Sequence, residues 1–180
     1  MTVETLLPNG VAGWPTGVVG NIDNTIASAS GTFYETSIED DVATIDLAAT
    51  VIVDGDTVNS VTVKVHAMTT GAGGKDGITV DVLIGGTPQA SQTMTGFLTG
   101  SSSTFTFTNA LWDSDWTAAQ IAGMQLTLTA VQTGKATAAD WQVDEIEVDI
   151  DYTAASGTSI PALSDISLSG GLQPLAGGLG

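Results

Sequence analysis

Two-residue alternation of apolar and acidic side chains in VDEIEVDIDY (143–152) is the feature that most constrains the fold of this chain. Successive side chains of an extended strand point to opposite faces, so neighbouring carboxylates on one face lie ~7 Å apart. The apolar face comprises Ile146, Val148, Ile150 and Tyr152, and the acidic face comprises Glu145, Glu147, Asp149 and Asp151. The segment therefore predicts a β-strand that covers a core with one face and presents a row of carboxylates to solvent or cations with the other.

The same period of two recurs in other segments that are rich in β-branched and aromatic residues, which is typical of half-buried antiparallel strands. These segments are 31–37, 43–53, 58–68, 77–84, 103–109 and 124–131. Turn signals such as Asp54-Gly55, Asp76-Gly77 and Gly85-Gly86 separate several of them. One stretch departs from the pattern: DSDWTAAQIAGM predicts a short helix over 116–122, capped by Asp115 and ended by Gly123.

These signals predict an all-β protein, a single antiparallel β-sandwich of jelly-roll type with one short helix and extended terminal arms. A length of 180 residues suits one domain with a sizeable core. We expect an extended N-terminal arm over 1–20, the sandwich over 21–153, and an apolar, Gly- and Ser-rich C-terminal arm over 154–180.

Both expected arms carry spaced apolar residues with little charge, a composition that suits an extended segment lying in a groove on another subunit. The predicted partner-binding residues are Leu6, Leu7, Trp14, Ile160, Leu163, Ile166, Leu168, Leu172, Leu175 and Leu179.

The charge balance argues against two classes of partner. Twenty Asp and Glu residues face three Lys and no Arg, which gives a formal net charge of −17. Binding to nucleic acid or to an anionic membrane depends on Lys and Arg, so we expect neither. The chain has no Cys, it has no apolar run of the ~20 residues that a membrane helix needs, and MTVETLLPNG does not resemble a signal peptide.

Acidic turns are the candidates for a metal. Glu39, Asp40 and Asp41 form one cluster, and Asp54 and Asp56 form another. Calcium takes oxygen ligands of this kind. The same residues are also ordinary turn formers, and neither cluster completes a twelve-residue calcium loop. Structural calcium at these turns is an open expectation, and no other cofactor is indicated.

No complete catalytic constellation is apparent, so we expect no enzymatic activity. Two carboxylates of 143–152 could match the spacing of a glycosidase pair, but they form a run on an outer face instead of lining a cleft. His66 is the only histidine, and no G-x-S-x-G elbow accompanies it. GAGGKDG (71–77) lacks the spacing of a phosphate-binding loop. The four tryptophans could form a carbohydrate platform or fill the core: Trp14, Trp112, Trp116 and Trp141.

The order of these segments resembles the β-sandwich (jelly-roll) structural proteins in the virions of tailed bacteriophages. LPNGVAGW and IEDD are followed by VNSVTVKVHA, GITVDVLIGG, WTAAQI, GMQLTLTA and the final WQVDEIEVDIDY, so that the similarity spans roughly residues 6–153.

The resemblance implies a non-enzymatic capsid decoration protein or minor head or tail protein, whose partners are other virion proteins and copies of itself. It also implies a location in the virion, assembled in the host cytoplasm and exposed on the extracellular particle. Two alternatives stay open: a carbohydrate-binding adhesion module on a phage tail or cell surface, and a component of a bacterial surface layer.

Overall fold

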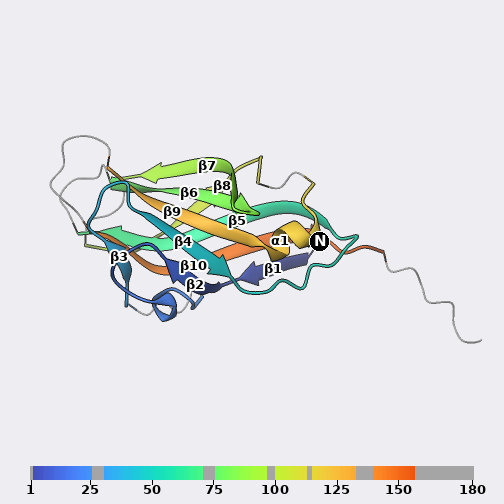
Figure 1. Cartoon of the computed structure of the whole chain (residues 1–180), viewed down its shortest axis with the longest axis horizontal. Helices are drawn as coiled ribbons and strands as arrows, with labels where there is room; N and C mark the ends of the chain where they lie inside the picture. Colours follow the sequence, from blue (N-terminus) through green and yellow to red (C-terminus); the bar gives the residue numbers. More distant parts are fainter. Residues whose placement is uncertain are drawn as a thin grey trace, which may run out of the picture.

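The computed structural model describes residues 2–25, 31–70, 76–96, 100–112, 115–132 and 140–156. Two antiparallel five-stranded sheets pack face to face, with one short α-helix at one end (Figure 1). The first sheet has the order β1-β10-β5-β8, and β3 also pairs with β10. The second sheet has the order β2-β4-β9-β6-β7. The prediction of a single antiparallel jelly-roll sandwich with one short helix is confirmed.

The strands and helices have the following bounds: β1 (Thr2–Leu6), β2 (Pro8–Ala12), the 3-10 helix η1 (Val19–Asn21), β3 (Tyr34–Thr36), β4 (Val42–Leu47), β5 (Thr57–Thr69), β6 (Asp76–Ile84), β7 (Thr87–Thr95), β8 (Ser103–Thr108), α1 (Ala118–Ala122), β9 (Met124–Gln132) and β10 (Trp141–Thr153).

β5 and β10 form the centre of the first sheet. Each spans 13 residues, and they pair antiparallel from Thr57↔Thr153 to Thr69↔Trp141. Their inward-facing residues follow the predicted alternation, with Val61, Val63 and Val65 in β5 all at most 2% exposed. Facing residues of β4, β6 and β9 complete one continuous core. Removal of this apolar surface from water is the main stabilising term of the sandwich.

The N-terminal segment differs from the expected extended arm. Residues 2–6 form β1 against the end of β10, and residues 8–12 form β2 against β4, so the segment contributes one strand to each sheet. Leu6 and Trp14 are 3% and 5% exposed within this chain's own core. Leu7 is half-buried, and its carbonyl oxygen accepts a hydrogen bond from the Ala48 amide. Leu6 and Trp14 are therefore core residues in this fold.

Trp14 is fixed from two directions. Its ring stacks on Tyr34 with centroids 5.5 Å apart, and its backbone N–H donates to the Tyr34 hydroxyl at 3.0 Å. Burial raises the pKa of Tyr34, the hydrogen bond from Trp14 opposes this shift, and the nearby charge of Asp41 adds to it.

Two strands differ from the sequence-based prediction: β4 is shorter than expected, and β7 is additional. β4 ends at Leu47, and the chain after it is bonded instead to Glu4 of β1 in the other sheet, whose carboxylate accepts from the Thr50 hydroxyl and the Val51 amide. β7 was not anticipated, although Gly85 and Gly86, both at positive φ, form a two-residue turn to β6. A Gly-Gly pair between strands is a recognised hairpin signal.

The short helix α1 lies where it was expected, but its cap is different. Thr117 is the N-cap: its hydroxyl accepts from the Gln120 amide, and the Gln120 side chain accepts from the Thr117 amide. This is the reciprocal capping box that T-A-A-Q encodes. Asp115 instead adopts a left-handed backbone conformation with φ 58°.

The predicted anchors Ile160, Leu163, Ile166, Leu168, Leu172, Leu175 and Leu179 lie outside the described residues. Within the described ranges, no helix is long and apolar enough to cross a membrane.

Candidate functional site

The acidic face, which we define as Glu147, Asp149 and Asp151, lies on the outer side of β10. The three side chains are half-buried, and they alternate with the core residues Val148 and Ile150. This part of the predicted carboxylate row is found where the alternation placed it.

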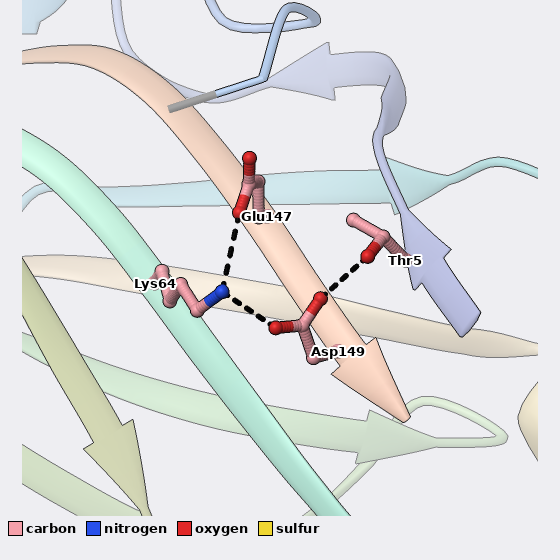
Figure 2. Close-up of polar contacts among 4 residues, drawn as sticks. All are labelled: Thr5, Lys64, Glu147 and Asp149. Carbon is pink, nitrogen blue, oxygen red and sulfur yellow. Dashed lines mark hydrogen bonds and ion pairs between the residues drawn. The ribbon is translucent and has the colours of Figure 1, made fainter. Parts of the chain in front are cut away.

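Lys64 of β5 neutralises part of this acidic face. Its Nζ lies 2.6 Å from Asp149 Oδ2 and 3.4 Å from Glu147 Oε2, and Thr5 Oγ1 of β1 donates to Asp149 Oδ1 at 2.6 Å (Figure 2). The hydrogen bond to Asp149 is the main reason why the pKa of Lys64 is raised; partial burial opposes the shift, and the charge of Asp149 and the contact with Glu147 add to it. The row is therefore tied across three strands.

The first member of the predicted row is not on the exposed face. Glu145 is 0% exposed and Asp144 is 2% exposed. Asp144 is the extra residue of an irregularity between Val143 and Glu145, where the pairing with β5 shifts register. The Gly31 amide donates to both oxygens of Asp144 at 3.0 and 3.1 Å, and the Asn24 amide donates to Glu145 at 3.1 Å. Backbone amides on the two sides of residues 26–30 thus bond to these two acids.

His66 faces this buried acid pair. Its Nδ1 lies 3.6 Å from Asp144 Oδ2, too long for a hydrogen bond, and its position on β5 pairs with Glu145 on β10. His66 Nδ1 has no hydrogen-bond partner, so a Ser–His arrangement through this nitrogen is not formed among the described residues. The cluster is a polar contact that joins β5, β10 and the chain at residues 24 and 31.

The two acidic turns proposed as calcium candidates lie at opposite ends of the sandwich. The Asp40 amide donates to Ala130 near the end of β9, whereas Asp56 immediately precedes β5. Asp41 accepts from the Thr36 hydroxyl at 2.6 Å and from the Val42 amide at 3.1 Å, so its carboxylate is engaged within its own turn. Within the described ranges, no three His, Asp or Glu side chains are grouped to hold a metal ion.

Asp56 fastens the last described residues to the sandwich. Its carboxylate accepts from the Val53 amide at 3.0 Å and from the Ala155 amide at 2.8 Å. The hydrogen bond from the Val53 amide is the main reason why the pKa of Asp56 is lowered, and the bond from the Ala155 amide lowers it further. Asp56 therefore serves the structure as an anchor for residue 155.

Replacing Asp56 with Ala is expected to speed hydrogen exchange of the Ala155 amide by roughly tenfold, because this charged acceptor is lost. Because the folded-state pKa of Asp56 is depressed, its contribution is present above the unfolded pKa and disappears as pH falls through the folded value. Exchange measured by NMR on the Asp54→Ala protein is the control. Unchanged exchange at Ala155 in Asp56→Ala would contradict the anchoring role.

A pocket of about 290 Å³ opens beside this anchor. The turn before β5 and the segment that leads into α1 form its walls. Its polar lining includes three carboxylates and two hydroxyls, and Trp116 supplies apolar surface: the polar residues are Asp54, Asp56, Thr57, Asp115 and Thr117. Apart from Asp54 and Asp56, these residues were not predicted as site residues, because nothing in the sequence joins 54–58 to 115–118.

All four tryptophans are buried, with Trp112 and Trp141 at 0% and 1% exposure and Trp14 and Trp116 at 5% and 6%. Trp112 also donates from its indole nitrogen to the Ala90 carbonyl of β7. Of the two uses considered for these residues, the structure supports a core role.

No protein-family model matches the chain, and no curated protein matches it. Solved structures with a similar fold include the CBM36-1 domain of a multidomain xylanase from the hindgut metagenome of Trinervitermes trinervoides, with 14% identity, 86% of this chain and 100% of that chain covered, and a TM-score of 0.40. Another is the structure of infectious bursal disease virus, Gt strain, with 10% identity and a TM-score of 0.35; the match covers 88% of this chain and 33% of that chain. A third is the carbohydrate-binding module CBM36 in complex with calcium and xylotriose, with 19% identity and a TM-score of 0.31; the match covers 66% of this chain and 78% of that chain. Similarity at this level concerns the sandwich fold alone.

Proposed function

We propose that this chain is a non-enzymatic virion structural protein of a tailed bacteriophage, a capsid decoration or minor head or tail protein. In this proposal it docks on other virion proteins and on copies of itself through its C-terminal segment. It would assemble in the host cytoplasm and be exposed on the extracellular particle. The bacteriophage setting rests on the sequence resemblance over residues 6–153.

One observation carries the proposal: the described core closes with Tyr152, while the sequence continues to Gly180. β10 is already paired on both edges, by β5 on one side and by β1 and β3 on the other. Ala155 is then fixed by Asp56, so the chain leaves the sandwich at a defined place. Residues 157–180 contain a single charged side chain, Asp165, and Leu and Ile residues spaced two to four apart. Such a segment gains most by burying its apolar side chains against a partner.

Removing residues 157–180 is expected to leave the melting temperature nearly unchanged and to abolish assembly. The sandwich keeps all its described strands and the Asp56 anchor, whereas the apolar anchors are lost. Thermal unfolding and sedimentation velocity measure the two effects separately. Normal incorporation or self-association of the truncated protein would overturn the proposal.

A full-length pair of variants controls for chain length and charge. Leu168→Asp with Leu172→Asp removes two apolar side chains and adds two negative charges. Ser167→Asp with Ser169→Asp adds the same charge in the same segment and keeps every apolar side chain. Assembly that fails only in the leucine pair supports apolar docking, and equal failure of both pairs would attribute the loss to charge.

A carbohydrate-binding adhesion module is the second candidate, and the pocket beside α1 favours it. Carboxylates and hydroxyls in a concave surface are suited to hydrogen-bonding sugar hydroxyls. The buried state of the described tryptophans and tyrosines counts against stacking of sugar rings on an exposed platform. Glycan-array binding that survives removal of 157–180 and is lost in Asp115→Ala, with an unchanged melting temperature, would favour this candidate over assembly.

A further inference from the structure

Two of the five buried polar side chains have no partner, and both lie at one end of the sandwich. The five are Thr36, Thr69, Asp76, Asp144 and Glu145. Thr36 donates to Asp41, and Asp144 and Glu145 accept from backbone amides. In the described part of the chain, by contrast, no hydrogen bond reaches Thr69 Oγ1 or either carboxylate oxygen of Asp76. Buried polar groups are nearly always paired, so this pair needs an explanation.

The topology brings Thr69 and Asp76 to the same end. Thr69 is the last residue of β5 and Asp76 is the first residue of β6, the next strand, in the opposite sheet. Thr69 continues the inward-facing series of Val65 and Ala67, and Asp76 begins the inward-facing series of Ile78 and Val80. Both side chains therefore face the interior between the sheets, at 0% and 1% exposure.

A fourth polar atom without a partner, on a third side chain, lies at the same end of the sandwich. Trp141 is the Cα partner of Thr69 on β10, it is 1% exposed, and its Nε1 finds no acceptor among the described residues. The main chain here is well bonded: the Gly100 amide donates to Thr69 O at 2.8 Å, and the Gly96 amide donates to Asp76 O at 3.0 Å. Among the described residues with inward-facing side chains at this end, the atoms without a partner belong to Thr69, Asp76 and Trp141. Gln142 Oε1, on the next residue of β10, also has no partner, but successive residues of a strand face opposite sides.

An ionised carboxylate in this position needs a compensating positive charge, because an isolated buried charge is strongly unfavourable. Lys64 is engaged by Glu147 and Asp149 on the outer face of the first sheet, and the sequence has no Arg. The other two lysines, Lys75 and Lys135, lie outside the described residues. Among the described residues, no cationic side chain contacts Asp76. The compensation therefore has to come from a species that the described side chains do not supply.

We propose that Asp76 and Thr69 form a buried binding site for a hydrated inorganic cation, which we name the Asp76 site. A carboxylate and a hydroxyl are oxygen ligands of the type that Mg²⁺ and Ca²⁺ prefer, and Mg²⁺ commonly binds through one or two carboxylates while keeping several waters. The Trp141 N–H cannot bind a cation, but it can donate to a water oxygen or to a carboxylate lone pair. The site is independent of the proposed assembly function, and it lies at the opposite end of the sandwich from the turn at 54–56. The turn at 39–41 lies at the same end, where Asp41 is engaged by Thr36.

Thermal unfolding with added Mg²⁺ or Ca²⁺ at constant ionic strength tests the site. The full-length protein is expected to show a saturable rise in melting temperature, because a ligand of the native state stabilises it. Asp76→Asn should lose the saturable rise. Asp23→Asn, which removes one charge from an exposed residue, should keep it. No saturable rise in the wild type, or an equal rise in Asp76→Asn, would overturn the proposal.

Terbium luminescence provides a second readout that does not depend on stability. Tb³⁺ replaces hard divalent cations and is sensitised by a nearby indole, so excitation of the full-length protein should give emission that Ca²⁺ displaces. Trp141→Phe is expected to remove most of this emission while the calorimetric binding of Ca²⁺ persists. Emission that is unchanged in both Trp141→Phe and Asp76→Asn would place the ion elsewhere and refute the site.

Discussion

Replacing Lys64 with Met is expected to lower the free energy of unfolding by about 1–3 kcal/mol, between the values for exposed and buried ion pairs. The side chains of Lys64, Glu147 and Asp149 are 32%, 12% and 22% exposed, so the two carboxylates are only partly solvated. Without the ammonium group they repel each other across a gap of one strand residue. Denaturant unfolding of the wild type and Lys64→Met at neutral pH measures the difference.

The pH dependence of this effect has a defined sign. The folded-state pKa of Lys64 is raised, chiefly by its hydrogen bond to Asp149. Its contribution is therefore fully present below the unfolded pKa and is lost as pH rises through the folded value. The stability gap between wild type and Lys64→Met should persist from neutral pH into the mildly alkaline range and close at more alkaline pH.

A triple variant separates charge from packing. Lys64→Met combined with Glu147→Gln and Asp149→Asn keeps the side-chain sizes and removes all three charges. If unpaired carboxylates cause the loss, the triple variant should be more stable than Lys64→Met alone, and added salt should narrow the gap between wild type and Lys64→Met. A loss of stability that persists in the triple variant and in high salt would instead assign it to the lysine's aliphatic stem.

The longest strands could be predicted because apolar and polar side chains alternate along them according to which face of the sheet is buried. Over most of β5, β6, β9 and β10 every second residue is apolar and buried, so the period of two can be recognised without knowledge of the pairing strands. β1 and β2 could not be predicted in this way, because TVETL and PNGVA contain few apolar residues and PNGVA also contains a Pro and a Gly. They are strands because β10 and β4 offer edges to pair with, which is tertiary information.

The burial of Asp144 and Glu145 could have been predicted from the sequence, whereas the Asp76 site and the pocket beside α1 could not. Val143 and Ile146 are both core residues, yet their odd spacing breaks the alternation within VDEI. That break is the sequence signal of the irregularity that buries Asp144 and Glu145, and a strict alternation overlooks it. The Asp76 site and the pocket beside α1 carry no such signal. Both join residues from segments that only the folded topology brings together.

Replacing Trp112 with Ala is expected to cost about 3–5 kcal/mol of stability, the range for removing a large buried aromatic side chain. Trp112 is 0% exposed, and its indole N–H donates to the Ala90 carbonyl on the edge strand β7. The variant therefore loses apolar burial and leaves a backbone acceptor of β7 without its donor. Calorimetry or denaturant unfolding measures the loss, with Leu111→Ala as a neighbouring control, because Leu111 is 61% exposed.

Trp112→Phe divides this cost between packing and the hydrogen bond. Phenylalanine keeps most of the apolar contact and removes the donor, so an intermediate loss of stability is expected. The result also bears on function. Loss of stability in both variants fits a tryptophan that ties the segment before α1 to β7. A normally stable Trp112→Ala protein that had lost glycan binding would instead mark Trp112 as a ligand contact and favour the adhesion module over the structural protein.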